Sequence, residues 1–392
     1  MRAILALVLV RLVLVVVLLL SPLTWRANAQ LPGDIRRFHS IATTSGVPWR
    51  DFEVEYPPVT WLAIVTVNGQ TTHETTIRTV LSQLLCDLAI AAGLAYGWSR
   101  RAAFIYLAVG LLMLTYPFIY LRLDLLSVTL AVWGLALVRR DRWKGGGVVL
   151  ALACFAKLWP LSVFPMLALQ RRWRALAVAV GSGAVGLAAW VGAVGTSGLQ
   201  QVLSFRNSTG WEIESVIGWF VRALGHNQAH VESGAWRVGA SAVQWSRPLG
   251  VGMVLTVAWI WWRAWRRRDD PGTVEAVAPL ASVAAFLAWP PLLSPQYVCW
   301  LLPFAALAVL YGRRAMAWLA AGVIGISTLQ LYIIREIIWG ENAALAMVLV
   351  RNLLLVTLVA VGCYELARKR GPVRTGPPAE PTPQPEPVGQ PA

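Results

Sequence analysis

Charged side chains are scarce in this sequence. Only 14% of its 392 residues are Asp, Glu, Lys or Arg, whereas 57% are hydrophobic. Apolar runs of about 20 residues, the length that crosses a bilayer as a helix, recur along the chain. No polar stretch between them is long enough to form a soluble domain of useful size. The composition therefore argues against a water-soluble protein and predicts an all-α, polytopic membrane helix bundle.

Cysteine is also scarce, and this limits the chemistry that the chain can offer. Its four cysteines, Cys86, Cys154, Cys299 and Cys363, fall inside apolar runs with no spacing typical of a metal site. We interpret them as small buried apolar residues. A soluble module that interleaves basic and aromatic residues is missing as well, so the net charge of +15 does not indicate nucleic-acid binding. It indicates membrane topology, with some attraction to anionic lipid head groups.

Ten apolar spans can be placed from hydropathy, and basic clusters alternate with them. The spans are expected at 4–24, 77–98, 102–121, 123–138, 175–194, 248–265, 274–290, 297–311, 315–334 and 343–363. The clusters are expected in the cytoplasm, at 100–101, 139–144, 171–174, 266–268, 313–314 and 368–370.

The stretch 145–169 must leave the cytoplasm and return for all the basic clusters to share one side. It is too short for two full spans and holds the sequence KLWP, Lys157 to Pro160, at its middle. We therefore expect two short helices that meet at a Pro-marked turn. The total becomes about twelve membrane segments with both chain ends in the cytoplasm.

The two ends of the chain need separate interpretation. Arg2, the apolar run and the small residues at 27–29 resemble a cleavable signal peptide. Arg11 interrupts that run, and its full length suits a retained span, which we favour. We expect one membrane domain over 1–370 and a disordered, Pro-rich cytoplasmic tail over 371–392 that is dispensable for chemistry.

The outer side carries the two long loops, 25–76 and 195–247, so function is expected there. The first loop holds four of the 19 acidic residues close together, namely Asp34, Asp51, Glu53 and Glu55. A carboxylate cluster at a membrane surface suits general-base work on a hydroxyl next to a lipid-borne substrate. The alternative is that these acids cap short interfacial helices.

The second loop is expected to contain an interfacial helix within 205–225. Trp219, Phe220 and Leu224 give this segment one apolar face, which fits a helix lying on the membrane. Three ionisable residues precede the helix and could reach into a cavity, namely Arg206, Glu212 and Glu214. An ordinary capping role for the two glutamates at the helix N-terminus is the alternative.

Five ionisable residues fall within or at the edge of expected spans, where charge is costly and faces a cavity or a partner. Lys157 lies near the outer tip of the short hairpin, where a phosphate is a natural counter-ion. Arg122 and Asp124 flank the outer start of one span, so pairing with each other or snorkelling is an alternative. Asp87 and Arg351 lie deeper, and we expect them to pair with each other or with the backbone.

The strongest short motif is SPQYVCWLLP, which begins at Ser294 on the outer side between two spans. Ser-Pro starts a helix whose free N–H groups and dipole attract an anion such as phosphate. Gln296, Tyr297 and Trp300 add hydrogen bonding and an aromatic face, as sugar-binding sites use.

Taken together, these motifs resemble a known family of membrane enzymes. The order is DIRRF, GVPWRDFEVEYPP, YLRLDLL, FAKLWPL, an EIES segment and SPQYVCWLLP. This order resembles the GT-C membrane glycosyltransferases, and specifically glycosyltransferase family 87, whose members use polyprenol-phosphate-mannose. The resemblance runs from about Asp34 to the span after Pro303.

The resemblance implies a polyprenyl-phosphate sugar as donor, a lipid or glycan acceptor, and inversion at the anomeric carbon. It gives the role of base to Asp34, with Asp51 and Glu55 as reserves. No cofactor or metal is expected, because the leaving group is a lipid phosphate rather than a nucleotide diphosphate. The expected donor phosphate contacts are Lys157, Arg122, Arg206, Ser294, Gln296 and Tyr297. The expected sugar or acceptor contacts are Tyr56, Glu214 and Trp300.

The chain departs from the family pattern at two positions, and these swaps could change sugar contacts. Trp49 and Phe38 stand where Tyr is common.

Two other functions remain open from the residues alone. A transporter or flippase would favour inverted repeats with broken midplane helices, and only one such pair, at 145–169, is evident. A non-catalytic assembly subunit is the third possibility. Long outer loops with clustered acids favour the enzyme, a glycosyltransferase in the plasma membrane.

Overall fold

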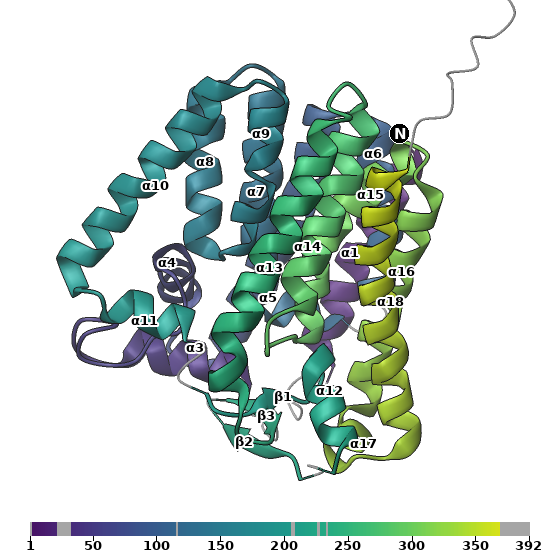
Figure 1. Ribbon diagram of the computed structural model, residues 1–392. Coiled ribbons are helices and arrows are strands. Elements are labelled where there is room, and N and C mark those ends of the chain that lie inside the picture. The colour runs from purple at the N-terminus through teal and green to yellow at the C-terminus, as the bar shows by residue number, and fades with distance from the viewer. Residues whose placement is uncertain are drawn as a thin grey trace, which may run out of the picture.

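The computed structural model describes residues 2–21, 33–114, 117–204, 208–225, 228–232 and 234–368. Arg206, the possible cleavage site at 27–29 and the tail 371–392 lie outside the described residues. Within the described part, long helices run side by side between two ends, and small elements gather at one of them (Figure 1).

Apolar helices form the bulk of the molecule, which is a polytopic helical membrane protein as the sequence predicts. Five stretches are long and apolar enough to cross a membrane: α1 (Arg2–Leu20), α5 (Thr72–Gly97), α10 (Trp173–Val194), α18 (Asn342–Ala367), and the stretch Arg314–Trp339. The last comprises α16 (Arg314–Gln330), η6 (Leu331–Ile333) and α17 (Ile334–Trp339).

The long helix α13 and a set of shorter helices complete the bundle. They are α6 (Arg100–Leu114), η1 (Pro117–Leu121), α7 (Asp124–Arg139), α8 (Trp143–Ala156), η2 (Trp159–Val163), α9 (Pro165–Leu169), α13 (Ala242–Trp265), η4 (Thr273–Val277), α14 (Ala278–Ala288), η5 (Pro295–Leu301) and α15 (Leu302–Leu310). The predicted hairpin over 145–169 is confirmed. Helix α8 ends at Ala156, and after the extended Lys157 the chain returns through η2 and α9.

The five basic clusters from 100–101 to 313–314, together with Arg368, lie at the end of the molecule that also holds the N-terminus (Figure 1). Glu275 makes an ion pair with Arg139 and accepts a hydrogen bond from Gln170, which joins loops far apart in the sequence. Asp270 and Arg313 form another ion pair at this end. The alternation of basic clusters with spans therefore corresponds to a real separation of the two ends.

The opposite end carries the two long loops, folded into short elements (Figure 1). These are α3 (Asp34–Thr43), α4 (Pro58–Val67), α11 (Ser197–Leu203), α12 (Val216–Ala223), β1 (Trp211–Glu212), β2 (His230–Glu232) and β3 (Ala235–Val238). The strands pair antiparallel in the order β1-β3-β2, a small sheet that the sequence analysis did not predict. Helix α3 buries Ile35, Phe38 and Ile41, which recur at helical spacing.

The predicted interfacial helix is present as α12, and its predicted apolar side chains divide between the bundle and the surface. Trp219 is half-buried and donates a hydrogen bond to the carbonyl oxygen of Leu345 in α18, at 2.8 Å. Phe220 and Leu224 are instead 51% and 82% exposed. Trp219 therefore anchors α12 to the bundle, and the other two side chains point away from it.

A buried ionic cluster fixes α1 in the bundle. Arg11 donates through Nε to a carboxylate oxygen of Asp87 at 2.8 Å and through Nη2 to the Leu107 carbonyl at 3.0 Å. Tyr106 and Tyr120 donate to the same carboxylate at 2.6 and 2.7 Å. The predicted pairing of Asp87 with Arg351 was therefore wrong, because Arg11 from another helix takes that place.

Breaking this cluster from one side should destabilise the protein strongly. Arg11→Leu leaves a buried carboxylate without its cation, which costs about 3–5 kcal/mol in comparable buried pairs. Thermal unfolding in lipid nanodiscs should show a large drop in Tm for Arg11→Leu. The double variant Arg11→Leu/Asp87→Leu should recover most of it, and a double variant as unstable as the single one would contradict this account.

Candidate functional site

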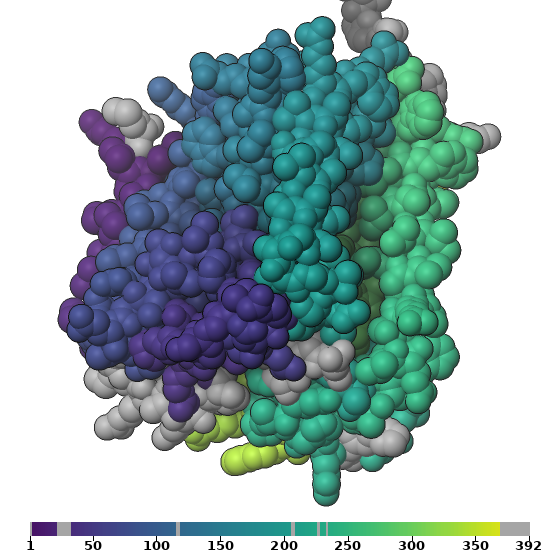
Figure 2. Space-filling view, turned by 90° about the vertical axis from the view of Figure 1, so that its left-hand side faces the viewer, coloured from purple at the N-terminus to yellow at the C-terminus, as the bar shows by residue number. Residues whose placement is uncertain are grey.

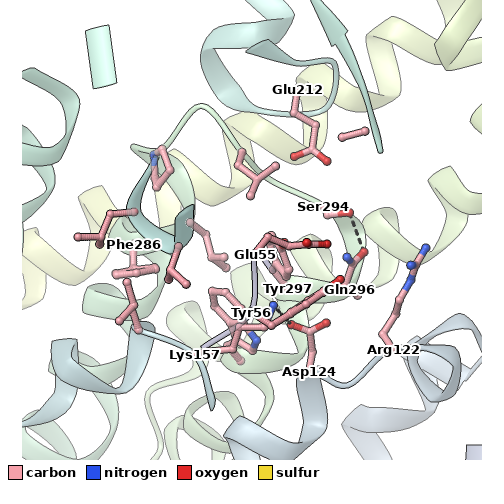
Figure 3. Close-up of a pocket in the computed structure, with 18 of the residues that line it drawn as sticks. Glu55, Tyr56, Arg122, Asp124, Lys157, Glu212, Phe286, Ser294, Gln296 and Tyr297 are labelled. Carbon is pink, nitrogen blue, oxygen red and sulfur yellow. Dashed lines mark hydrogen bonds and ion pairs between the residues drawn. The ribbon is translucent and has the colours of Figure 1, made fainter. Parts of the chain in front are cut away.

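One cavity of about 900 Å³ lies where the small elements meet the helix bundle. It collects ten of the residues that the sequence analysis expected in the site: Asp34, Glu55, Tyr56, Arg122, Lys157, Glu214, Ser294, Gln296, Tyr297 and Trp300. Most of the labelled polar side chains lie close together around its centre in Figure 3. Residues from both outer loops and from membrane segments thus share one site.

Asp34 and Arg122 form an ion pair at the edge of the cavity. Asp34 is in the first turn of α3, where the helix dipole favours a carboxylate. Arg122 lies just before α7, and its guanidinium also stacks 4.2 Å from the ring centroid of Phe118. The suggested pairing of Arg122 with Asp124 is therefore wrong, because Asp34 from the first loop provides the partner.

Lys157 and Asp124 form the second ion pair of the cavity, with 3.4 Å between Nζ and the carboxylate. The ammonium group also lies 5.5 Å from the Tyr56 ring centroid and 5.1 Å from that of Tyr297. Lys157 occupies the break between α8 and η2, so its side chain leaves the chain where no helix continues. The carboxylate and the two aromatic rings thus hold the cation at the cavity lining.

The segment 47–56 is held by hydrogen bonds that set Tyr56 at the cavity. Trp49 is buried, has a φ of 62° and donates through Nε1 to the Tyr56 carbonyl at 3.1 Å. Gln201 of α11 bonds the Val54 N–H at 2.9 Å and the Trp49 carbonyl at 2.9 Å. Trp49 does not line the cavity. The presence of Trp at this position, where Tyr is expected, therefore affects the packing of the loop and not a direct contact in the cavity.

The two reserve acids differ in position. Glu55 lines the cavity, where Arg37 donates two hydrogen bonds to its carboxylate at 2.9 and 3.3 Å. Asp51 does not line the cavity and braces its own turn by accepting from Val47 N–H at 2.7 Å. Hydrogen bonds from Arg50 and from Val47 hold the pKa of Asp51 below its usual value.

The SPQY segment forms an aromatic and polar wall. Tyr297 stacks on Trp300 with ring centroids 4.7 Å apart, and Trp300 stacks on Trp159 at 5.8 Å. Ser294 and Gln296 share a hydrogen bond of 2.7 Å at the start of η5. Tyr297 and Gln296 of this wall lie beside Lys157 and Asp124 (Figure 3).

Glu212 and Glu214 line the cavity from the second loop. The suggested capping role does not hold, because Ser215 accepts the Gly218 N–H at the N-terminus of α12. Burial raises the pKa of Glu214 to about 8, with Glu212 adding to this and Arg351 opposing it. The expectation that Arg351 bonds the backbone is confirmed by its 2.5 Å hydrogen bond to the Glu214 carbonyl.

An apolar groove continues the cavity along α13. Its apolar lining includes Leu161, Pro165, Val254 and Val257 of α13, and Phe286 of α14. Val254 is 60% exposed, so the groove opens sideways. Figure 2 shows a hollow between the teal helix α10 and the green helix α13 on this face.

A model of glycosyltransferase family 87 matches residues 54–295, more than half of the chain. The chain belongs to glycosyltransferase family 87. The protein is thus a membrane glycosyltransferase, and the predicted resemblance is confirmed. The search of curated proteins found no match.

Most of the residues that line the cavity of this family 87 protein fall within the matched range. The lining residues outside it are Asp34, Phe38, Gln296, Tyr297, Trp300, Leu331 and Ile334. Sequence reasoning did not assign Asp124 to the site, although it noticed the residue. Its signal was an acid at the edge of a span, two residues from Arg122. Phe286 carried no signal beyond hydrophobicity.

The raised pKa of Glu214 has a consequence for stability. In the folded protein Glu214 holds its proton up to about pH 8, whereas the unfolded chain loses it near 4.5. The folded state therefore binds more protons between these values, and stability falls as pH rises through this range. Glu214→Gln removes this group, so its Tm should fall less between pH 5 and pH 8 than that of the wild type. Parallel curves for the two proteins would contradict the assignment.

Proposed function

We propose that this glycosyltransferase moves a hexose, mannose by the family resemblance, from a polyprenyl-phosphate donor to a hydroxyl of a lipid or glycan. The observation that carries the proposal is the continuity between the apolar groove and the charged cavity. A polyprenyl chain needs an apolar path between helices, and its phosphate needs cations at the end of that path. The apolar groove along α13 supplies the path, and Lys157 and Arg122 line the charged cavity that continues it.

The donor fits the cavity in one direction. Its tail lies along α13, where the lining from Ser246 to Trp261 extends for about 22 Å at the rise of an α-helix. Its phosphate lies near Lys157 and Arg122, with Ser294, Gln296 and Tyr297 beside it. Tyr56 and Trp300 then offer aromatic faces to the sugar.

The reaction that we propose needs one base and one stabilised leaving group. Asp34 takes the proton of the acceptor hydroxyl, whose oxygen attacks the anomeric carbon. The bond from that carbon to the phosphate oxygen breaks, and polyprenyl phosphate leaves with the negative charge. Lys157 and Arg122 stabilise this charge. The donor phosphate competes with Asp34 for Arg122, and so releases the carboxylate beside the sugar.

Asp34 is preferred to the reserve acids because of their surroundings. Asp51 lies outside the cavity, and its lowered pKa makes it a weaker base. Glu55 lines the cavity but is fixed by two hydrogen bonds from Arg37. We assign both to support of the loop.

We further propose a GT-C type arrangement in the plasma membrane for residues 1–370, with about twelve membrane segments and the site on the outer side. The basic clusters at the opposite end support this orientation. The tail 371–392 is then cytoplasmic and not needed for transfer.

Replacing the base should remove transfer without removing the fold. Asp34→Asn keeps the size of the side chain but cannot accept a proton, so turnover should fall by about 100-fold or more. The measurement is transfer of radiolabel from polyprenyl-phosphate mannose in membranes. Glu53→Gln in the same loop, which does not line the cavity, is the matched control. Wild-type turnover in Asp34→Asn would refute its role as base.

Removing the cation should weaken use of the donor. Lys157→Ala loses a charge-assisted contact with the phosphate, which is worth about 1.5–3 kcal/mol. The apparent KM for the lipid donor should therefore rise by about tenfold or more. Lys144→Ala, at the opposite end of α8, should leave it unchanged. An unchanged donor KM in Lys157→Ala would contradict the phosphate assignment.

Reporter fusions test the orientation. Reporters at Arg140, Arg172 and Arg267 should give a cytoplasmic signal, and one at Thr209 an outside signal. The structure places the first three at the end opposite the cavity, so an outside signal at Arg172 would contradict the orientation.

A further inference from the structure

Glu214 is a buried carboxyl of the cavity wall with one oxygen that its protein surroundings leave unsatisfied. Glu214 is only 5% exposed, and among the described residues its Oε1 atom has no hydrogen-bond partner. Its backbone is clamped from α18, since Arg351 donates to its carbonyl and Asn352 bonds the next carbonyl, of Ser215, at 3.3 Å. The side chain is thus held at the cavity wall with one oxygen unsatisfied.

Other unsatisfied polar atoms lie on the same cavity. Among the described residues, Trp236 Nε1, Trp300 Nε1 and Ser162 Oγ have no hydrogen-bond partner. Buried polar atoms in native proteins are nearly always hydrogen-bonded, so several unsatisfied atoms on one cavity point to a ligand. A hydroxyl group is both donor and acceptor and can satisfy a carboxyl oxygen as well as an indole N–H.

We propose that Glu214 is a specificity-determining residue for the acceptor, and that it bonds a hydroxyl of an uncharged polyol group. This inference rests on the proposed function and names its acceptor class. Glu212 and Glu55 add negative charge to the same cavity, so a phosphate-bearing group on this side would be repelled. A neutral sugar or other polyol pays no such cost.

The position of the second loop separates this subsite from the donor phosphate. Glu212, two residues before Glu214, lies on the opposite side of the cavity from Lys157 and Asp124, with Glu55 between them (Figure 3). The second loop, which carries Glu214, therefore meets the cavity away from Lys157, and we assign the acceptor to that side. The raised pKa of Glu214 agrees with a carboxyl that keeps its proton and can donate a hydrogen bond.

Binding of a neutral probe tests this without any transfer reaction. The full-length protein in lipid nanodiscs is titrated with octyl α-D-mannopyranoside by calorimetry, in the presence of saturating polyprenyl phosphate. Glu214→Ala should raise the Kd by about tenfold or more, because a buried hydrogen bond is lost. Glu214→Gln keeps a donor and an acceptor and should bind close to wild type. Glu53→Gln is the matched control and should not differ.

Two outcomes would overturn the proposal. One is equal affinity for the mannoside in wild type, Glu214→Ala and Glu214→Gln. The other is tighter binding of octyl phosphate than of the mannoside at this site, or loss of mannoside binding when polyprenyl phosphate is added. Because no sugar transfer is measured, a failure of the proposed donor in the radiolabel assay would remain distinguishable from a failure of this subsite.

Discussion

Lys157 carries a positive charge into an apolar bundle, and its ion pair with Asp124 is the constraint on which the site depends. The pair is possible only because α8 stops at Ala156 and the chain turns back through η2. Tyr56 and Tyr297 approach the ammonium from the loop and from the SPQY segment. One break in a membrane hairpin therefore assembles the first loop, α7 and η5 around a common cation.

The carboxylates of the cavity differ in their partners, and this divides their roles. Asp124 pairs with Lys157, Glu55 with Arg37 and Asp34 with Arg122. We propose that the donor phosphate also binds Arg122. One oxygen of Glu214 has no hydrogen-bond partner among the residues that the structure describes. A site of this kind can stabilise a leaving phosphate and still retain a base and an acceptor contact, because each of these carboxyl groups interacts with a different partner.

Hydropathy and the alternation of basic clusters predicted the spans and the broken hairpin, because both are local properties of the sequence. The motifs also predicted most of the cavity lining. The ion pairs could not be predicted: Arg122 and Asp124 are neighbours in sequence, yet each pairs with a residue from a distant segment. The small sheet was missed because strands of two to four residues carry too little alternation to detect.

The central claim is that a polyprenyl chain lies along α13 with its phosphate at Lys157. Photo-crosslinking tests it most directly, with a diazirine-bearing polyprenyl phosphate in nanodiscs and peptide mapping by mass spectrometry. The account predicts labels on the groove-lining residues Val254, Val257 and Phe286 that unlabelled polyprenyl phosphate removes. Labels spread over the outer faces of α10 and α16, without competition, would contradict it.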